Sequence, residues 1–200
     1  MNRLTLAIMV VTISMPVAAT SLYEVSVDDL YKESAIVVSG TIEVGAKLPK
    51  DCGVSYSVRV DRSYKGDTAK GRLFRFRGFG PMQVGARYFL FMSKSGNEFR
   101  AIASTNGFDM KLRTEYLERC KHLWPPYTVN LTGAGALKVT GTYSDAVKKA
   151  VLFDNFLIRS PIGVDVTELS KGDRYDNDHV DAAMAVEDFT HYMNKLTGTK

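Results

Sequence analysis

Alternating apolar and polar positions dominate the chain between residues 36 and 77. In residues 36–44 the apolar positions, from Ile36 to Val44, face one way, and the polar positions face the other. Residues 54–61 alternate in the same manner, and in residues 73–77 two phenylalanines alternate with two arginines. A period of two is typical of strands with one buried face. We therefore predict three half-buried strands.

Residues 88–92 are apolar on both faces, which predicts a strand that is central in a sheet or covered by another element. Residues 93–97 have the composition of a hairpin turn and lead into a fifth strand at 99–102. Five strands joined by short turns within about 70 residues favour a closed or nearly closed antiparallel barrel. Closure would also remove exposed strand edges.

Helical patterns flank this region. Ser26 and Asp29 have the spacing of a capping box, which predicts a short helix that ends near Ser34. A second helix is predicted before Pro125-Pro126 by a stripe of Leu112, Tyr116, Cys120 and Leu123. Further strands are expected within 136–143, 151–158 and 164–167. A last helix is expected from about Val186, with Val186, Phe189, Met193 and Leu196 on one face.

The first residues have the order of a secretion signal. Arg3 precedes an apolar run at residues 4–11, and small residues lead to an expected cleavage after Ala19. The alternative is a membrane anchor, which needs about 20 apolar residues, whereas this run is interrupted by polar residues and by Pro16. We therefore expect a secreted or periplasmic protein with a signal peptide at 1–19 and no membrane span after cleavage.

Charge and cysteine content narrow the possibilities. The net charge of +4 falls short of a nucleic-acid-binding signature, so no nucleic-acid partner is expected. Cys52 and Cys120 are the two cysteines, and in an oxidising compartment such a pair is expected to form a disulfide. A bridge that closes so long a loop would stabilise the fold by about 4 kcal/mol in the chain-entropy model.

Three features carry a resemblance to a known family. They are the small-residue strand around Gly40, the strand that ends in Tyr64-Lys65-Gly66, and Gly85 leading into the aromatic strand at 88–91. With them, residues 34–102 resemble the netrin-like module, the OB-type barrel of tissue inhibitors of metalloproteinases and related bacterial proteins. The resemblance implies an OB-type barrel and the binding of a protein or polymer.

This chain departs from the family at its N-terminus. The inhibitors chelate the zinc of the protease with an N-terminal Cys, whereas the mature chain is expected to begin at Thr20. Inhibition of zinc metalloproteinases by chelation is therefore not expected. The expected fold is mainly β with flanking helices. It has a five-stranded OB-type barrel in 20–104 and a smaller α+β C-terminal extension, 105–200, packed on it.

Few residues suggest catalysis. His122, His179 and His191 stand in separate contexts and form no ligand-spaced pair, and no Gly-x-Ser-x-Gly motif occurs. We predict no enzyme and no cofactor; the alternative is a hydrolase with an unrecognised site. Asn130-Leu131-Thr132 matches a glycosylation acceptor. An acidic run is interpreted as a solvated loop, with a calcium site as the alternative; it contains Asp173, Asp176, Asn177, Asp178 and Asp181.

A basic strand face is the candidate binding surface. If the second and third strands are adjacent, Arg59, Arg75 and Arg77 project from the same outer surface, and Arg100 joins them. The alternatives are an ordinary solvated exterior and a docking face for an acidic partner. The sequence favours a non-catalytic protein that binds another protein as an inhibitor or antagonist. The second hypothesis is a module that binds an anionic cell-envelope polymer.

Overall fold

A long antiparallel hairpin is the base of the fold in the computed structural model, which describes residues 25–97, 107–140, 150–153, 158–161, 164, 167–168 and 182–198. Strand β2 (Ile36–Lys47) pairs with β3 (Val54–Lys65) along nearly its whole length, and the register shifts at three places. Such irregularities bend a strand and increase its twist, which lets the hairpin curl into a barrel.

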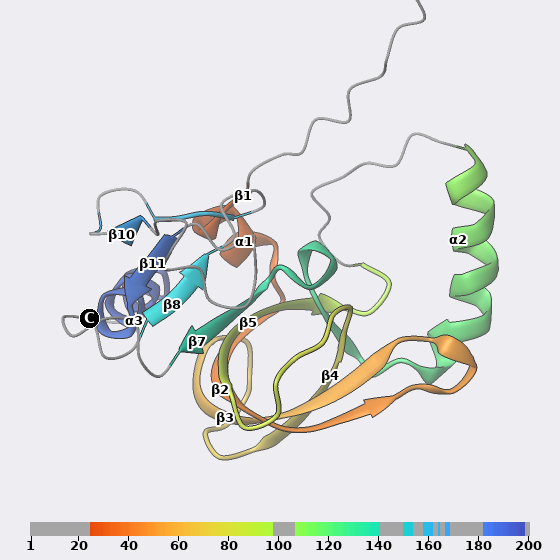
Figure 1. Cartoon of the computed structure of the whole chain (residues 1–200), viewed down its shortest axis with the longest axis horizontal. Helices are drawn as coiled ribbons and strands as arrows, with labels where there is room; N and C mark the ends of the chain where they lie inside the picture. The colour runs from red at the N-terminus through yellow and green to blue at the C-terminus, as the bar shows by residue number, and fades with distance from the viewer. Residues whose placement is uncertain are drawn as a thin grey trace, which may run out of the picture.

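Five strands close into a ring (Figure 1). Strand β4 (Leu73–Gly78) pairs antiparallel with β3, and β5 (Arg87–Lys94) pairs antiparallel with β2. The gap between β4 and β5 is closed by β6 (Tyr127–Val129), parallel to β4 and antiparallel to β5. The expected five-stranded OB-type barrel with flanking helices is confirmed.

The closing strand comes from a part of the chain that the sequence pattern did not suggest. Residues 99–102, the expected fifth strand, lie outside the described residues. Strand β6 instead follows α2 (Gly107–Cys120), so the barrel draws on residues beyond 104, the boundary expected from the sequence. A strand of three residues is too short to show a period of two clearly, which explains why the pattern missed it.

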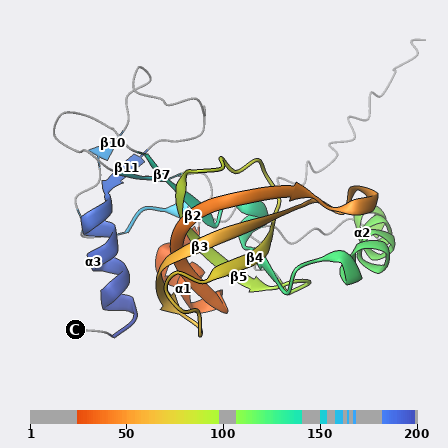
Figure 2. The same ribbon diagram turned by 90° about the horizontal axis from the view of Figure 1, so that it is seen from below.

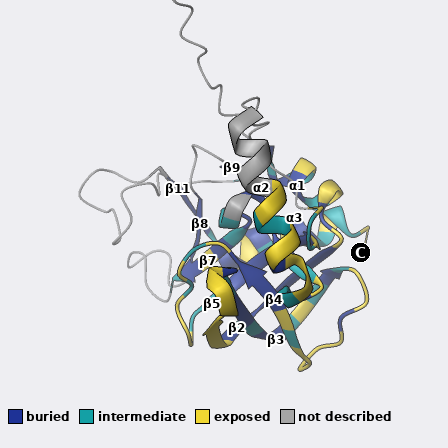
Figure 3. Ribbon diagram, turned by 90° about the vertical axis from the view of Figure 1, so that its right-hand side faces the viewer, coloured by how far each residue is buried: buried dark blue, intermediate teal, exposed yellow. Residues whose placement is uncertain are grey.

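The interior of the barrel is filled by alternate side chains of its strands, and the dark blue strands of Figure 3 show this burial. These residues are apolar and buried in one cluster: Ile36, Val38, Ile42, Tyr56, Val58, Val60, Phe76, Tyr88, Leu90, Met92 and Val129. They are the inward positions of the period-two pattern. Their removal from water is the main stabilising contribution to the barrel.

A second core covers the outside of β2 and β5. Phe89 and Phe91 point away from the barrel interior and pack with α1 (Val27–Glu33), α3 (Val186–Leu196) and the sheet extension. The Phe89 ring meets the Phe189 ring edge-on, with centroids 4.7 Å apart. The expectation that the apolar strand at 88–92 is covered on both faces is confirmed.

The sheet extension continues from β5 away from the hairpin. It is formed by β7 (Ala136–Thr140), β8 (Ala150–Phe153), β11 (Ala182–Ala185) and β10 (Thr167–Glu168), in that order. A separate parallel pair joins β1 (Val25–Ser26) to β9 (Ile158–Arg159). Figure 2 shows α3 and this extension at one end of the molecule and α2 at the other.

Helix α1 has the caps that its sequence predicts. The Ser26 hydroxyl accepts a hydrogen bond from the backbone N–H of Asp29, and the helix ends at Ser34. The Lys65 ammonium donates to the carbonyl oxygens of Tyr31 and Lys32, each at 2.8 Å. A cation at the C-terminus of a helix also interacts favourably with its dipole. Strand β3 is thereby tied to α1.

Candidate partner-binding face

The outer surface of β2, β3 and β4 is the candidate binding surface. Cα partners in an antiparallel sheet point their side chains to the same face. The strand registers therefore place three rows of residues side by side on this surface: Thr41, Arg59 and Leu73; Val44, Ser57 and Arg75; Ala46, Ser55 and Arg77. Strand alternation thus brings Arg59, Arg75 and Arg77 to one side of the sheet, as expected from the sequence.

Two of these arginines are exposed and are held by neighbouring side chains. The Arg59 Nε donates to Glu43 Oε1 at 2.6 Å, and this hydrogen bond raises the pKa of Arg59 above its usual value. The Arg75 Nη2 donates to Ser55 Oγ at 3.0 Å. The Arg59–Glu43 pair lies in water and adds little stability. It does restrict where the guanidinium points.

Two exposed apolar side chains lie on the same face. Val44 and Leu73 are each 54% exposed. Val44 was expected on the buried face with Ile42, but the register shifts between them, so that Val44 is the partner of Ser57. A bulge of one residue moves the following side chain to the other face. Leu73 could have been found from the alternation with Phe74, whereas nothing in the sequence pattern marks the bulge.

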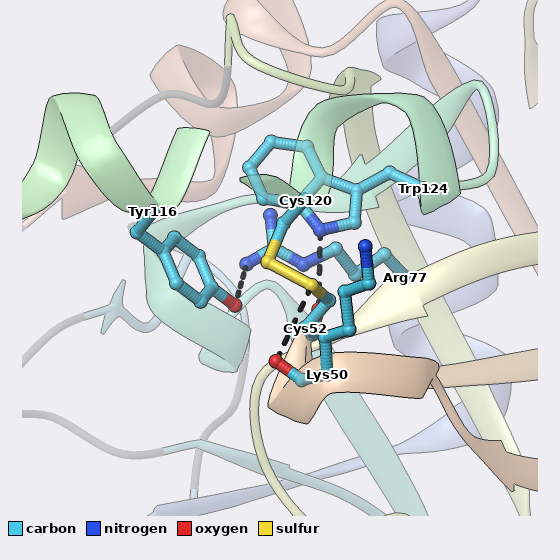
Figure 4. The surroundings of a disulfide bond; sticks show 6 residues. All are labelled: Lys50, Cys52, Arg77, Tyr116, Cys120 and Trp124. Carbon is cyan, nitrogen blue, oxygen red and sulfur yellow. Dashed lines mark hydrogen bonds between the residues drawn. A yellow bond between two sulfur atoms is a disulfide. The ribbon is translucent and has the colours of Figure 1, made fainter. Parts of the chain in front are cut away.

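Arg77 was expected to be exposed, and this expectation is wrong. Its side chain is only 3% exposed because aromatic side chains cover it. The guanidinium carbon lies 3.7 Å from the centre of the Trp124 ring and 4.4 Å from that of Phe79. The Arg77 Nη2 donates to the Tyr116 hydroxyl at 3.2 Å (Figure 4). The strand places Arg77 on the outer face, but another part of the chain lies over that end of the face.

The segment that covers Arg77 comprises residues 116–124, and we call it the cap. It runs from the end of α2 through η2 (Lys121–Leu123) to Trp124, and a disulfide holds it in place. Cys52 and Cys120 are bonded, as expected from the sequence, and both are fully buried. The Trp124 Nε1 donates to the carbonyl oxygen of Cys52 at 3.1 Å. The bridge therefore joins the β2–β3 loop to the connection between β5 and β6, as Figure 4 shows.

The loop on the other side of the bridge has a restricted backbone. In η1 (Pro49–Asp51), Lys50 and Asp51 have φ values of 57° and 55°, in the left-handed region that costs energy for residues other than glycine. The Asp51 carboxylate pairs with Lys47 at 2.8 Å, which lowers the pKa of Asp51 and raises that of Lys47. Both side chains are exposed, so the disulfide is the stronger constraint on this loop.

The stacked environment of Arg77 leads to a first prediction. Arg77→Lys is expected to lower the free energy of unfolding by about 2 kcal/mol, because an ammonium group replaces neither the planar stack on Trp124 nor the hydrogen bond that the guanidinium donates to Tyr116. Arg75→Lys, on the same strand but exposed, is the matched control and should change stability by less than about 0.5 kcal/mol. Urea unfolding measures both. Equal stability of the two variants would contradict the structural role of the stack.

The remaining candidates from the sequence do not join this surface. Arg100, His179 and the acidic run from Asp173 to Asp181 lie outside the described residues. His122 and His191 are exposed, on η2 and α3. Across the described ranges, no group of three or more His, Cys, Asp or Glu side chains is arranged to hold a metal ion. The side chains of the face are arginines, hydroxyl groups and aliphatic groups, which can form hydrogen bonds and apolar contacts.

The glycosylation motif at residues 130–132 is not an accessible acceptor site in the folded protein. Asn130 is fully buried, and its side-chain amide donates to the Ser34 hydroxyl at 2.8 Å. An acceptor asparagine must be reachable on the surface, so the folded protein does not offer this one for glycosylation. Asn130 instead links the connection after β6 to the end of α1.

In the part of the chain that the structure describes, no helix is both long enough and apolar enough to cross a membrane. No protein-family model matches the chain, and no curated protein matches it.

Proposed function

We propose that this protein is a non-catalytic binding protein that recognises a protein partner through the barrel face, defined as Thr41, Val44, Ser57, Arg59, Leu73 and Arg75. One observation carries the proposal: exposed apolar side chains, Val44 and Leu73, alternate on this face with two arginines whose positions are restricted by hydrogen bonds. Burial of the apolar pair by a partner would remove apolar surface from water.

The chemistry of the face suits a partner in which carboxylate groups alternate with apolar side chains. An arginine presents a planar fork of donors that matches a carboxylate, and arginine is enriched at protein interfaces. Glu43 accepts a hydrogen bond from Arg59, and Ser55 accepts one from Arg75. These bonds limit the motion of the two guanidinium groups, which reduces the conformational entropy lost on binding.

The position of the face in the barrel gives support by analogy. OB-folds bind ligands across their second and third strands and across the loops that follow the first and fourth strands. The corresponding strands here are β3 and β4, and the corresponding loops are joined by the disulfide. Fold analogy does not name the partner. We propose further that the protein acts in the periplasm or after secretion, as an inhibitor or antagonist, in keeping with its disulfide and signal-like N-terminus.

An anionic envelope polymer is the second candidate for the same face. Arg59 and Arg75 supply the cationic groups that such a polymer needs. The two candidates differ in whether binding depends on Val44 and Leu73. A protein partner would bury these side chains, whereas a highly charged polymer gains little from contact with them. Replacing the apolar pair alone therefore distinguishes a protein partner from a polymer.

The experiment is a pull-down from envelope extract with the mature protein. Arg59→Ser with Arg75→Ser is expected to abolish capture, and wild-type capture should weaken as salt rises, because exposed charges are screened beyond about 8 Å at physiological ionic strength. Val44→Ser with Leu73→Ser should also abolish capture of a protein partner. The control is Lys138→Ser with Lys195→Ser, which removes two exposed cations away from the face.

Each of these surface changes should cost less than about 0.5 kcal/mol, so all variants should remain folded. Muramidase or polysaccharide digestion of the extract should leave a protein partner captured. Loss of capture after digestion, with no effect of the apolar variant, would favour the polymer. Unchanged capture by the arginine variant would refute binding through this face.

A further inference from the structure

Arg77 extends the barrel face by one row, but the cap covers it. Strand partners place Arg77 opposite Ser55, in the row next to that of Ser57 and Arg75. Trp124 stacks on its guanidinium, and the Tyr116 hydroxyl accepts a hydrogen bond from it. Both side chains belong to the cap. If the cap moved away, Phe79 would still lie against one face of the Arg77 guanidinium, but its other face would open beside the arginines of the two preceding rows.

The cap packs separately from the two main cores. Its residues Tyr116, Leu123 and Trp124 are partly buried in a small cluster, and the fully buried members of this cluster are Cys120 of the cap and Leu48 and Cys52 of the β2–β3 loop. None of these residues belongs to the barrel interior or to the core beneath α1 and α3. Small clusters with few buried residues open at low free energy, while larger cores stay closed. Movement of the cap therefore does not require either main core to open.

The chain is anchored again directly after the cap. Ser95 donates from its hydroxyl to the carbonyl oxygen of Pro125 at 2.6 Å and from its backbone N–H to that of Pro126 at 3.0 Å. Strand β6, which closes the barrel, begins at the next residue. The point about which the cap can turn thus lies between Trp124 and Pro125. The closing strand stays in place on its far side.

The covalent tie of the cap is the Cys52–Cys120 bond. On one side it holds the end of α2, and on the other it holds a loop in which Lys50 and Asp51 have left-handed φ values. Opening the bond would let this loop relax toward an ordinary backbone conformation. The non-covalent contacts that would remain include the hydrogen bonds from Trp124 to Cys52 and from Arg77 to Tyr116, the stack of Trp124 on Arg77, and the apolar packing on Leu48.

We propose that the disulfide is a redox-controlled latch: its reduction releases the cap and uncovers Arg77, which widens the cationic barrel face. The reductant is a dithiol. One of its thiolates attacks a sulfur of the bridge, forms a mixed disulfide and releases the other cysteine as a thiolate, which takes up a proton. The second thiol of the reductant resolves the mixed disulfide. The protein gains two thiols, and the reductant becomes a disulfide.

Burial of both sulfurs makes the latch depend on local opening of the cap. Cys52 and Cys120 have no exposed surface, so a dithiol reaches them only when the cap cluster opens. Burial therefore slows reduction of the oxidised protein. While both cysteines stay reduced, the disulfide that holds the cap cannot form again.

The test measures the accessibility of Arg77 in the mature protein and needs no partner. The oxidised and the dithiothreitol-reduced proteins are treated with phenylglyoxal, which modifies accessible arginines, and each site is quantified by peptide mass spectrometry. Arg75 should react in both states. Arg77 should be protected in the oxidised protein, should react after reduction at a rate approaching that of Arg75, and should be protected again after reoxidation.

A second variant separates release of the cap from unfolding. Cys52→Ser with Cys120→Ser should reproduce the reactivity of the reduced protein and retain the native far-UV circular dichroism. Continued protection of Arg77 in a protein with two free thiols would overturn the proposal. So would reactivity that appears only together with loss of the native spectrum. Because the reactivity of Arg77 is measured without a partner, these outcomes are independent of whether the barrel face binds the proposed partner.

Discussion

Gly40→Ala is expected to lower the free energy of unfolding by about 3 kcal/mol, at the upper end of the usual cost of overpacking. A Cβ at this position would lie 2.3 Å from the carbonyl oxygen of Arg59 and 2.7 Å from Cγ2 of Val58. Both atoms belong to β3, which is hydrogen-bonded to β2 on one side and to β4 on the other. The neighbouring backbone cannot move away without breaking these ladders. Urea unfolding of the purified variant measures the loss.

Gly80→Ala is the matched control. Gly80 lies in the loop after β4, and a Cβ there would meet no atom within 4 Å. Its substitution should change stability by less than about 0.5 kcal/mol. If Gly40→Ala proved as stable as Gly80→Ala, the close approach of β2 and β3 at this position would be incorrect.

Strand alternation was sufficient to predict most of the barrel. A strand that is buried on one face must alternate, so β2, β3 and β4 could be recognised from period two alone. The apolar run at residues 88–92 predicted burial on both faces, and β5 is buried on both, between the barrel interior and the second core. In these cases the local pattern and the tertiary environment agree, because each side chain meets the same neighbours along the strand.

Long-range features could not be predicted in this way. Strand β6 forms part of the barrel because it reaches the gap between β4 and β5, not because of its own three residues. Val44 is exposed because of a bulge in the pairing with β3, and a bulge depends on the partner strand. Alternation placed Arg77 on the correct face of the sheet. Its burial depends on Trp124, 47 positions later in the sequence, and on the bridge that holds the cap.

The candidate site was therefore only partly predictable. Arg59 and Arg75 were found because they alternate with inward side chains, and the cysteine pair was found from the redox argument. The apolar part of the barrel face could not be found in the same way, because the period-two pattern places Val44 on the buried side of its strand. An exposed apolar side chain cannot be distinguished from a buried one by residue type alone. Its exposure emerges only from the register.

Removing the disulfide is expected to cost about 4 kcal/mol, the second large effect. The bridge joins residues 68 positions apart, and the loop between them includes β3, β4 and β5. In the chain-entropy model the bridge acts on the unfolded chain, which it prevents from expanding. Cys52→Ser with Cys120→Ser should therefore unfold at a lower urea concentration. Its m-value should be larger, because the unfolded chain exposes more surface.

The native state should change little by comparison. The bridge lies in the small cluster of the cap, apart from the barrel interior and the second core, so the far-UV circular dichroism should be retained. Reduced wild-type protein is the control and should match the double variant in midpoint and in m-value. A loss below about 1 kcal/mol, well under the usual range for a native bridge, would show that the unfolded chain is not restrained as the model requires.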